Sequence, residues 1–146
     1  MEKKTKTALV QMIKYGIVGV MNTIVTLSVI FICKSMLGFH PMFSNTMGYI
    51  AGFINSFLWN KTWVFKSKNK YGKELLKFAT GFAVCYVFQF FVVYVLIYHT
   101  PLATKEWQLA EFVLSGYGVA TIIGSIAYTM VNFFYNRSVT FSQKRG

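Results

Sequence analysis

Acidic residues are scarce in this chain: aspartate is absent, and its glutamates lie outside the long apolar stretches, at Glu2, Glu74, Glu106 and Glu111. Proton relays in membranes commonly use a carboxylate placed inside a span. The shortage therefore weighs against a proton-coupled exporter. The chain also lacks a nucleophile paired with a base and a cluster of metal-ligating side chains. We accordingly expect a protein that is not an enzyme and that needs neither a metal nor a cofactor.

Cysteine is scarce as well, with Cys33 and Cys85 the two in the chain. Cys33 is expected near the outer end of the first apolar stretch and Cys85 inside the third, so we predict neither a disulfide nor a metal site. The Gly-x-x-x-x-Gly-Lys-[Ser/Thr] loop that holds nucleotide phosphates does not occur in the sequence. ATP-driven transport is therefore not expected.

Apolar sequence, in contrast, fills most of the chain, which is 55% hydrophobic with a mean hydropathy of +0.47. A helix that crosses a bilayer needs roughly 20 mostly apolar residues. Four stretches are close to this length and predict membrane spans at residues 9–33, 42–62, 76–99 and 112–136. We expect an all-α integral membrane protein, a single domain over residues 1–146, with a basic cytoplasmic link at 63–75.

The basic residues predict which way the spans run. Lysine and arginine outnumber the acidic residues by 15 to 4, for a net charge of +11. Most precede the first span, fill the link or follow the fourth span (Arg137, Lys144, Arg145), whereas the other two connections carry Lys34 and Lys105. The positive-inside rule places both termini and the link in the cytoplasm. We interpret the charge as topogenic and as attractive to anionic lipids, and we expect no nucleic-acid partner.

The chain repeats itself. An entrance motif, Lys-aromatic-small, begins the first and third spans at 14–16 and 77–79. An exit motif, Asn-basic-hydroxyl-x-x-Phe, ends the second and fourth spans at 60–65 and 136–141. Because each half contains two spans, both halves insert the same way up, which predicts two parallel two-helix repeats.

These motifs resemble the GtrA-like family. The resemblance rests on Lys14 to Gly19 with Asn22 downstream, on both exit motifs, and on the Asn-Phe pair at 132–133 that leads into Asn136-Arg137. It extends from Val10 to Phe141. The first half departs from the pattern at Ser56, where the second half has Asn132, so equivalent roles for the two halves do not follow.

The resemblance implies a function in cell-surface polysaccharide and teichoic-acid glycosylation. In that role the protein moves a sugar linked to a polyprenyl (undecaprenyl) phosphate across the bacterial cytoplasmic membrane, as a multi-pass flippase. A Lys-rich, Arg-poor composition also suggests a bacterium. With neither nucleotide nor carboxylate coupling, movement is expected to be facilitated and downhill. The alternative is a membrane adaptor that anchors or recruits a polyprenyl-phosphate glycosyltransferase.

Such a substrate has an anionic head group, which needs cations and hydrogen-bond donors at the cytoplasmic boundary. Six residues lie at that boundary and predict a head-group site: Lys14, Asn60, Lys61, Lys77, Asn136 and Arg137. Basic residues at helix ends also anchor a span without any ligand. Both interpretations remain open for the lysines.

Deeper polar residues predict a path for the head group: Asn22, Thr26, Asn55, Ser56, Gln89, Ser125 and Asn132. Ser125, Asn132 and Asn136 share one helical face. Helix–helix hydrogen bonding is the alternative role for these residues. Gly48 and Gly52 are four apart, a spacing that lets helices approach closely. Because four helices enclose little volume, a homodimer is the expected assembly.

Overall fold

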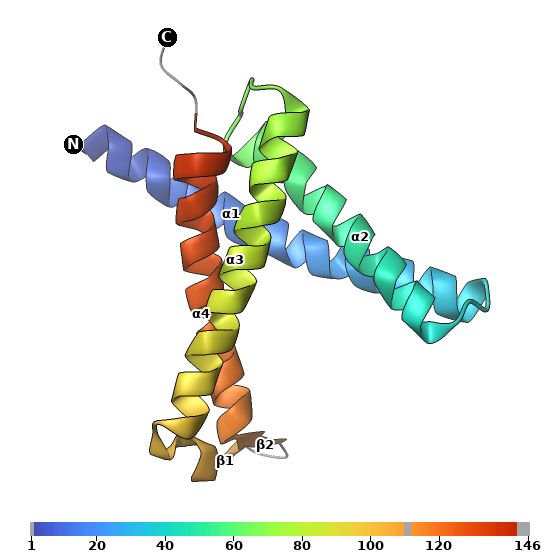
Figure 1. Ribbon diagram of the computed structural model, residues 1–146, viewed down its shortest axis with the longest axis vertical. Coiled ribbons are helices and arrows are strands. Elements are labelled where there is room, and N and C mark those ends of the chain that lie inside the picture. The colour runs from blue at the N-terminus through green and yellow to red at the C-terminus, as the bar shows by residue number, and fades with distance from the viewer. Residues whose placement is uncertain (1, 110–111, 143–146) are drawn as a thin grey trace. The chain divides into compact units, whose positions relative to one another are not determined.

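The computed structural model describes residues 2–109 and 112–142, and it forms two compact units that divide between Lys70 and Tyr71. Each unit is built on a pair of antiparallel helices (Figure 1). The division falls in the link between the two predicted halves. Glu111, Lys144 and Arg145, used in the sequence predictions, lie outside the described residues.

The first unit contains α1 (Glu2–Phe31) and α2 (Pro41–Trp59), each followed by a turn of π-helix, η1 (Ile32–Met36) and η2 (Asn60–Val64). Gly38 turns the connection with a φ of +70°, a conformation that glycine adopts without steric cost. The His40 ring accepts a hydrogen bond from the backbone N–H of Met42, and proline takes the first position of α2. Both features favour a helix start at this point.

Glycines on α2 let the two helices of this unit approach closely. A Cβ on Gly48 would lie 2.8 Å from the carbonyl oxygen of Thr26, and a Cβ on Gly52 would collide with the Thr26 hydroxyl. The four-residue spacing therefore does bring α1 and α2 together. In membranes, small residues at such positions allow backbone atoms to pack against the neighbouring helix.

The second unit contains α3 (Tyr71–Tyr98), a short 3₁₀ turn η3 (Pro101–Thr104), a two-stranded hairpin, α4 (Gly116–Tyr135) and the π turn η4 (Asn136–Thr140). The hairpin pairs β1 (Glu106–Leu109) with β2 (Phe112–Ser115) in antiparallel register, with Glu106 opposite Ser115. The described chain is otherwise helical, in line with the predicted all-α class, but the stretch 112–115, predicted to begin the fourth span, is a strand. α4 begins at Gly116 because the Ser115 hydroxyl caps it, accepting from the N–H of Gly118.

The basic link is shorter than predicted. The sequence predicts a link at 63–75, but η2 continues to Val64 and α3 begins at Tyr71. Lys66, with a φ of +51°, reverses the chain just after η2. The early start of α3 also places Glu74 in the first helical turn, where its side chain is 2% exposed. Glu74 is therefore a buried carboxylate within a helix rather than a residue of the link.

Among the described residues, three helical stretches are long and apolar enough to cross a membrane, Lys6–Met36, Tyr71–Tyr98 and Gly116–Thr140. They support an integral membrane protein built mainly of helices. α2 is helical over 19 residues. It is less apolar because polar side chains interrupt it, at Ser44, Asn45, Asn55 and Ser56. The fourth crossing stays a prediction.

Candidate functional site

Both exit motifs form the same local structure, a turn of π-helix that ends at the motif's phenylalanine. The N–H of Phe65 donates to the carbonyl of Asn60 at 2.9 Å, and the N–H of Phe141 donates to the carbonyl of Asn136 at 2.8 Å. Both asparagine side chains are buried, at 1% and 0% exposure. π turns within helices are rare and frequently occur at functional sites. The repeat seen in the sequence is thus a repeat of structure at these two positions.

The entrance motifs contact the exit motifs through their aromatic residues, one pair in each unit. Tyr15 packs edge-on against Phe65 with ring centroids 6.2 Å apart. Phe78 packs against Phe141 at 6.0 Å. Such pairs add to the stability given by burial alone. We call this pair the aromatic clasp of each unit, and it holds the entrance motif of one helix against the exit motif of the other.

In the second unit, polar side chains follow one face of α4 down to the exit motif. The amide of Asn136 donates to Asn132 Oδ1 at 3.0 Å, and the amide of Asn132 donates to the Tyr128 hydroxyl at 3.2 Å. We call these three residues the α4 ladder. Two of its members were predicted from their spacing on one helical face. Buried amides in a ladder of this kind orient one another.

The first unit has a shorter version of the same arrangement. The Asn60 amide donates to the carbonyl oxygen of Ser56 at 2.8 Å and to its hydroxyl at 3.2 Å. Ser56 therefore does for Asn60 what Asn132 does for Asn136, which is to accept from the amide one turn later. The Asn60 side-chain oxygen accepts no hydrogen bond from any residue that the structure describes.

Each unit also has a polar contact between its two helices at mid-span. Asn55 on α2 donates to Asn22 on α1 at 2.7 Å. Gln89 on α3 donates to Ser125 on α4 at 3.1 Å. Thr26, also predicted for the path, lies against Gly52. These residues thus hydrogen-bond or pack the helices of their own unit, which is the alternative that the sequence left open.

The predicted cations differ in how they are engaged. Lys61 is 2% exposed, and its ammonium donates to the carbonyl of Asn69 at 2.6 Å. Lys77 donates to the carbonyl of Val139 at 3.3 Å, which holds it against η4. Arg137 is half-buried in η4, and no hydrogen bond or ion pair joins its guanidinium to the described part of the chain. Lys14 lies over the Trp63 ring, 5.0 Å from its centroid.

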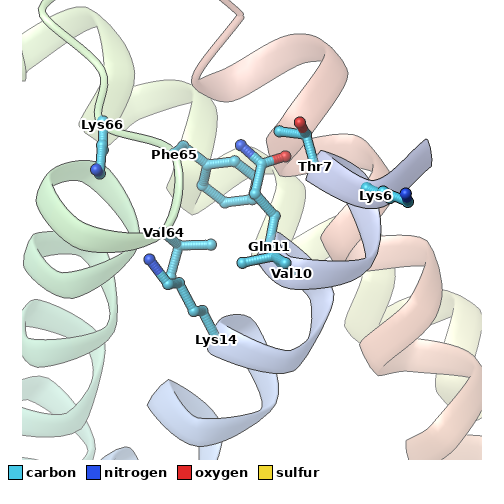
Figure 2. Close-up of a pocket in the computed structure, with 8 residues that line it drawn as sticks. All are labelled: Lys6, Thr7, Val10, Gln11, Lys14, Val64, Phe65 and Lys66. Carbon is cyan, nitrogen blue, oxygen red and sulfur yellow. The ribbon is translucent and has the colours of Figure 1, made fainter. Parts of the chain in front are cut away.

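A pocket of about 390 Å³ opens in the first unit between the start of α1 and the residues that end η2. It is lined by Lys6, Thr7, Val10, Gln11, Lys14, Val64, Phe65 and Lys66 (Figure 2). In Figure 2, Lys14 and Lys66 lie on the same side of the view and Lys6 on the opposite side. Of the six predicted head-group residues, the structure brings Lys14 to this pocket.

Sequence reasoning missed Gln11, Lys6 and Lys66 as pocket residues because they read as part of a topogenic tail and link. A signal was present: Thr7, Gln11 and Lys14 are spaced by four and three, which places them on one face of a helix. Tyr128 was missed because tyrosine is common in apolar spans, although it lies four residues before Asn132.

The fold and these contacts define a class of protein: a small multi-pass membrane protein with paired amide and cation motifs at helix ends. The family model described as "GtrA/DPMS, transmembrane domain" matches residues 14–141. The chain belongs to this family, as its motifs predict. The family description names a transmembrane domain, which supports a membrane location for this chain.

One curated relative is an "Uncharacterized membrane protein YngA" of Bacillus subtilis (strain 168). It is 34% identical over 86 residues, which cover 52% of this chain. The match spans 57% of that relative's length. Its name supports a membrane location for this chain and states no activity.

Proposed function

We propose that this protein moves a polyprenyl-phosphate-linked monosaccharide across the bacterial cytoplasmic membrane, for glycosylation of cell-surface polysaccharide or teichoic acid. The observation that carries the proposal is the α4 ladder, which runs from the Tyr128 hydroxyl to the amide of Asn136, the residue next in sequence to the half-buried Arg137. A long prenyl tail stays in lipid. The protein therefore has to replace the water contacts of the phosphate and the sugar alone.

Arg137 is the strongest candidate for phosphate capture. Its planar guanidinium suits two phosphate oxygens, and none of the described residues hydrogen-bonds or ion-pairs with it. Lys77 on α3 contacts the same turn η4, because its ammonium donates to the carbonyl of Val139. In the first unit the corresponding candidate is Lys61, whose ammonium would first have to leave the carbonyl of Asn69.

The amides serve the sugar in this proposal. The amide hydrogens of Asn60 and Asn136 already donate within their own helices. In the first unit this leaves a carbonyl oxygen at Asn60 that suits a sugar hydroxyl better than a phosphate. The mid-span contacts, Asn22–Asn55 and Gln89–Ser125, would exchange partners with the head group as it passes.

Leaflet exchange in reconstituted liposomes tests the proposal. The probe is a labelled polyprenyl-phosphate glucose, scored by its accessibility to a membrane-impermeant oxidant. Arg137→Ala should lower the exchange rate about tenfold or more, because a charge-assisted contact is lost. Ser138→Ala is the matched control, since this exposed neighbour lies in the same turn. Equal rates for wild type, Arg137→Ala and control would contradict the assignment.

An adaptor for a membrane glycosyltransferase is the second candidate. One observation favours it: several lysines at and beside the link are exposed, namely Lys66, Lys68, Lys70 and Lys73. Such a row suits an acidic protein surface. An adaptor would bind the enzyme in a salt-sensitive way and show no exchange on its own. Replacing the four lysines by glutamine would then release the enzyme.

A further inference from the structure

We propose that the pocket between α1 and η2 binds the head group of a phosphate-linked sugar, with the phosphate on Lys14 and Lys66 and a sugar hydroxyl on Gln11. The proposal deepens the proposed function, on which it rests for the substrate class. It assigns a site to the first unit, and its three proposed ligand contacts lie outside the exit motif at 60–65. We call this pocket the α1 pocket.

Charge is the first argument. Three lysines line the α1 pocket, and no acidic residue is among its lining residues in the described part of the chain. The Lys14 ammonium has a cation–π contact with Trp63, and no hydrogen bond joins it to any described residue. Its three donors are therefore available to an anion. Lysine is a mobile point charge that suits a phosphate arriving from solvent.

Gln11 supplies the second, independent argument. Its side-chain oxygen is buried, and no described residue donates to it. A buried acceptor left without a donor costs free energy, so such an atom calls for a ligand that donates. A phosphodiester has no proton to give at neutral pH, whereas a sugar hydroxyl does. The pocket therefore suits a ligand that carries both an anionic group and a hydrogen-bond donor, and a sugar phosphate has both.

Size and rigidity agree with a small head group. The volume of about 390 Å³ lies at the lower end of the range for small-molecule sites, roughly 300–1,000 Å³. Its wall includes Phe65, which the aromatic clasp with Tyr15 holds in place. Lys66, which lines the pocket, has a left-handed backbone with a φ of +51°. Conformations of this kind in a residue with a side chain are strained and often mark ligand sites.

Trp63 offers a direct readout because Lys14 lies over its ring. A variant with Trp59→Phe and Trp107→Phe keeps Trp63 as the single tryptophan, reconstituted in phosphatidylcholine nanodiscs. Two probes are titrated, a short-chain polyprenyl-phosphate glucose and the same polyprenyl phosphate without sugar. We expect the glucose lipid to bind about three- to tenfold more tightly, the difference that one hydrogen bond makes.

Two substitutions separate the two contacts. Gln11→Leu should remove the preference for the glucose lipid and leave binding of the bare lipid unchanged. Lys14→Gln should weaken both lipids about tenfold or more. Lys34→Gln is the matched control, an exposed lysine of the same unit in η1 at the other end of α1. Helical circular dichroism equal to wild type shows that each variant folds.

Several results would overturn the pocket. Equal binding of both lipids to wild type removes the role of Gln11, and unchanged binding in Lys14→Gln removes the role of the cation. Competition at equal concentration by phosphatidic acid or by inorganic phosphate would make it a general anion site. Binding that follows the prediction without leaflet exchange would leave the pocket and refute the flippase. Leaflet exchange that is unchanged by both Gln11→Leu and Lys14→Gln would refute the role of the α1 pocket and leave the flippase proposal standing.

Discussion

Four asparagine side chains carry much of the polar structure of the two units, and they hydrogen-bond to one another in two pairs. Asn55 and Asn22 join α2 to α1, and Asn136 and Asn132 form steps of the α4 ladder. In lipid, water does not replace a lost partner, so an amide left alone remains uncompensated. These residues were predictable as polar positions in apolar spans. Their pairing was not, because it depends on how far one helix slides along the other.

The Asn22–Asn55 contact should couple α1 to α2 energetically. Asn55→Ala is expected to lower the free energy of unfolding, and a double-mutant cycle with Asn22→Ala should give a coupling of about 0.6–1.7 kcal/mol. Unfolding in mixed detergent micelles measures it. Asn45→Ala on the same helix is the control, because Asn45 is exposed. A coupling indistinguishable from that with Asn45 would show that the hydrogen bond contributes nothing.

The aromatic clasp of the second unit should contribute more than a lipid-facing ring of the same type. Phe141 is 3% exposed and packs on Phe78, whereas Phe91 on α3 is 60% exposed. Phe141→Ala should destabilise the protein by about 3–5 kcal/mol because it leaves a cavity. Phe91→Ala should change the free energy of unfolding little. Similar losses for the two variants would argue against the clasp.

At the scale of elements, the helices and their repeat follow from the sequence, but two features do not. The π turns leave the apolar pattern almost unchanged, since one extra residue shifts the register only in the turn that follows α1, α2 and α4. Strand β2 occupies Phe112–Ser115, which is apolar enough to pass for the start of α4. Hydropathy reports how apolar a segment is, but it does not distinguish a helix from a strand. Ser115, a good helix cap just before Gly116, was the local signal for the true start.

Gly48 tests the packing of α1 against α2. A Cβ at Gly48 would meet the backbone oxygen of Thr26, which cannot move aside as a side chain would. Gly48→Ala should therefore destabilise the helical pair by about 1–3 kcal/mol. Gly19→Ala is the matched control, because nothing lies within 4 Å of its added Cβ. The control should be neutral or slightly stabilising, since alanine favours a helix.

Unfolding in detergent micelles, followed by helical circular dichroism, compares the two glycine variants directly. A cysteine cross-link between α1 and α2 gives a second readout of their separation. The packing account would be wrong if both variants unfolded at the same detergent concentration as wild type.

At the scale of the whole molecule, the placement of charge predicts the topology. The lysines at and near the link should lie in the cytoplasm, and Lys105 should lie outside. In a background with Cys33 and Cys85 replaced by serine, Lys105→Cys should react with a membrane-impermeant maleimide in intact cells. Lys68→Cys should react only after the cells are opened. Labelling of both positions in intact cells would exclude the four-span topology with both termini inside.

The shortage of acidic residues indicates downhill movement. Glu74 proves to be a carboxylate buried in the first turn of α3 rather than exposed in the link. The sequence could not reveal this, because the helix start at Tyr71 is hidden in a polar, lysine-rich segment. We expect a homodimer because four helices enclose little volume. It would add a second copy of every side chain but no new group that could couple transport to an energy source.

Leaflet exchange by the purified protein tests the central claim most directly. Liposomes that contain it receive a labelled polyprenyl-phosphate glucose, with no nucleotide present and with equal pH on both sides. We predict that the label equilibrates between the leaflets at a rate well above that of protein-free liposomes. Exchange that begins only when ATP or a pH gradient is supplied would contradict a downhill flippase, and loss of the gradient-driven rate in Glu74→Gln would then point to proton coupling.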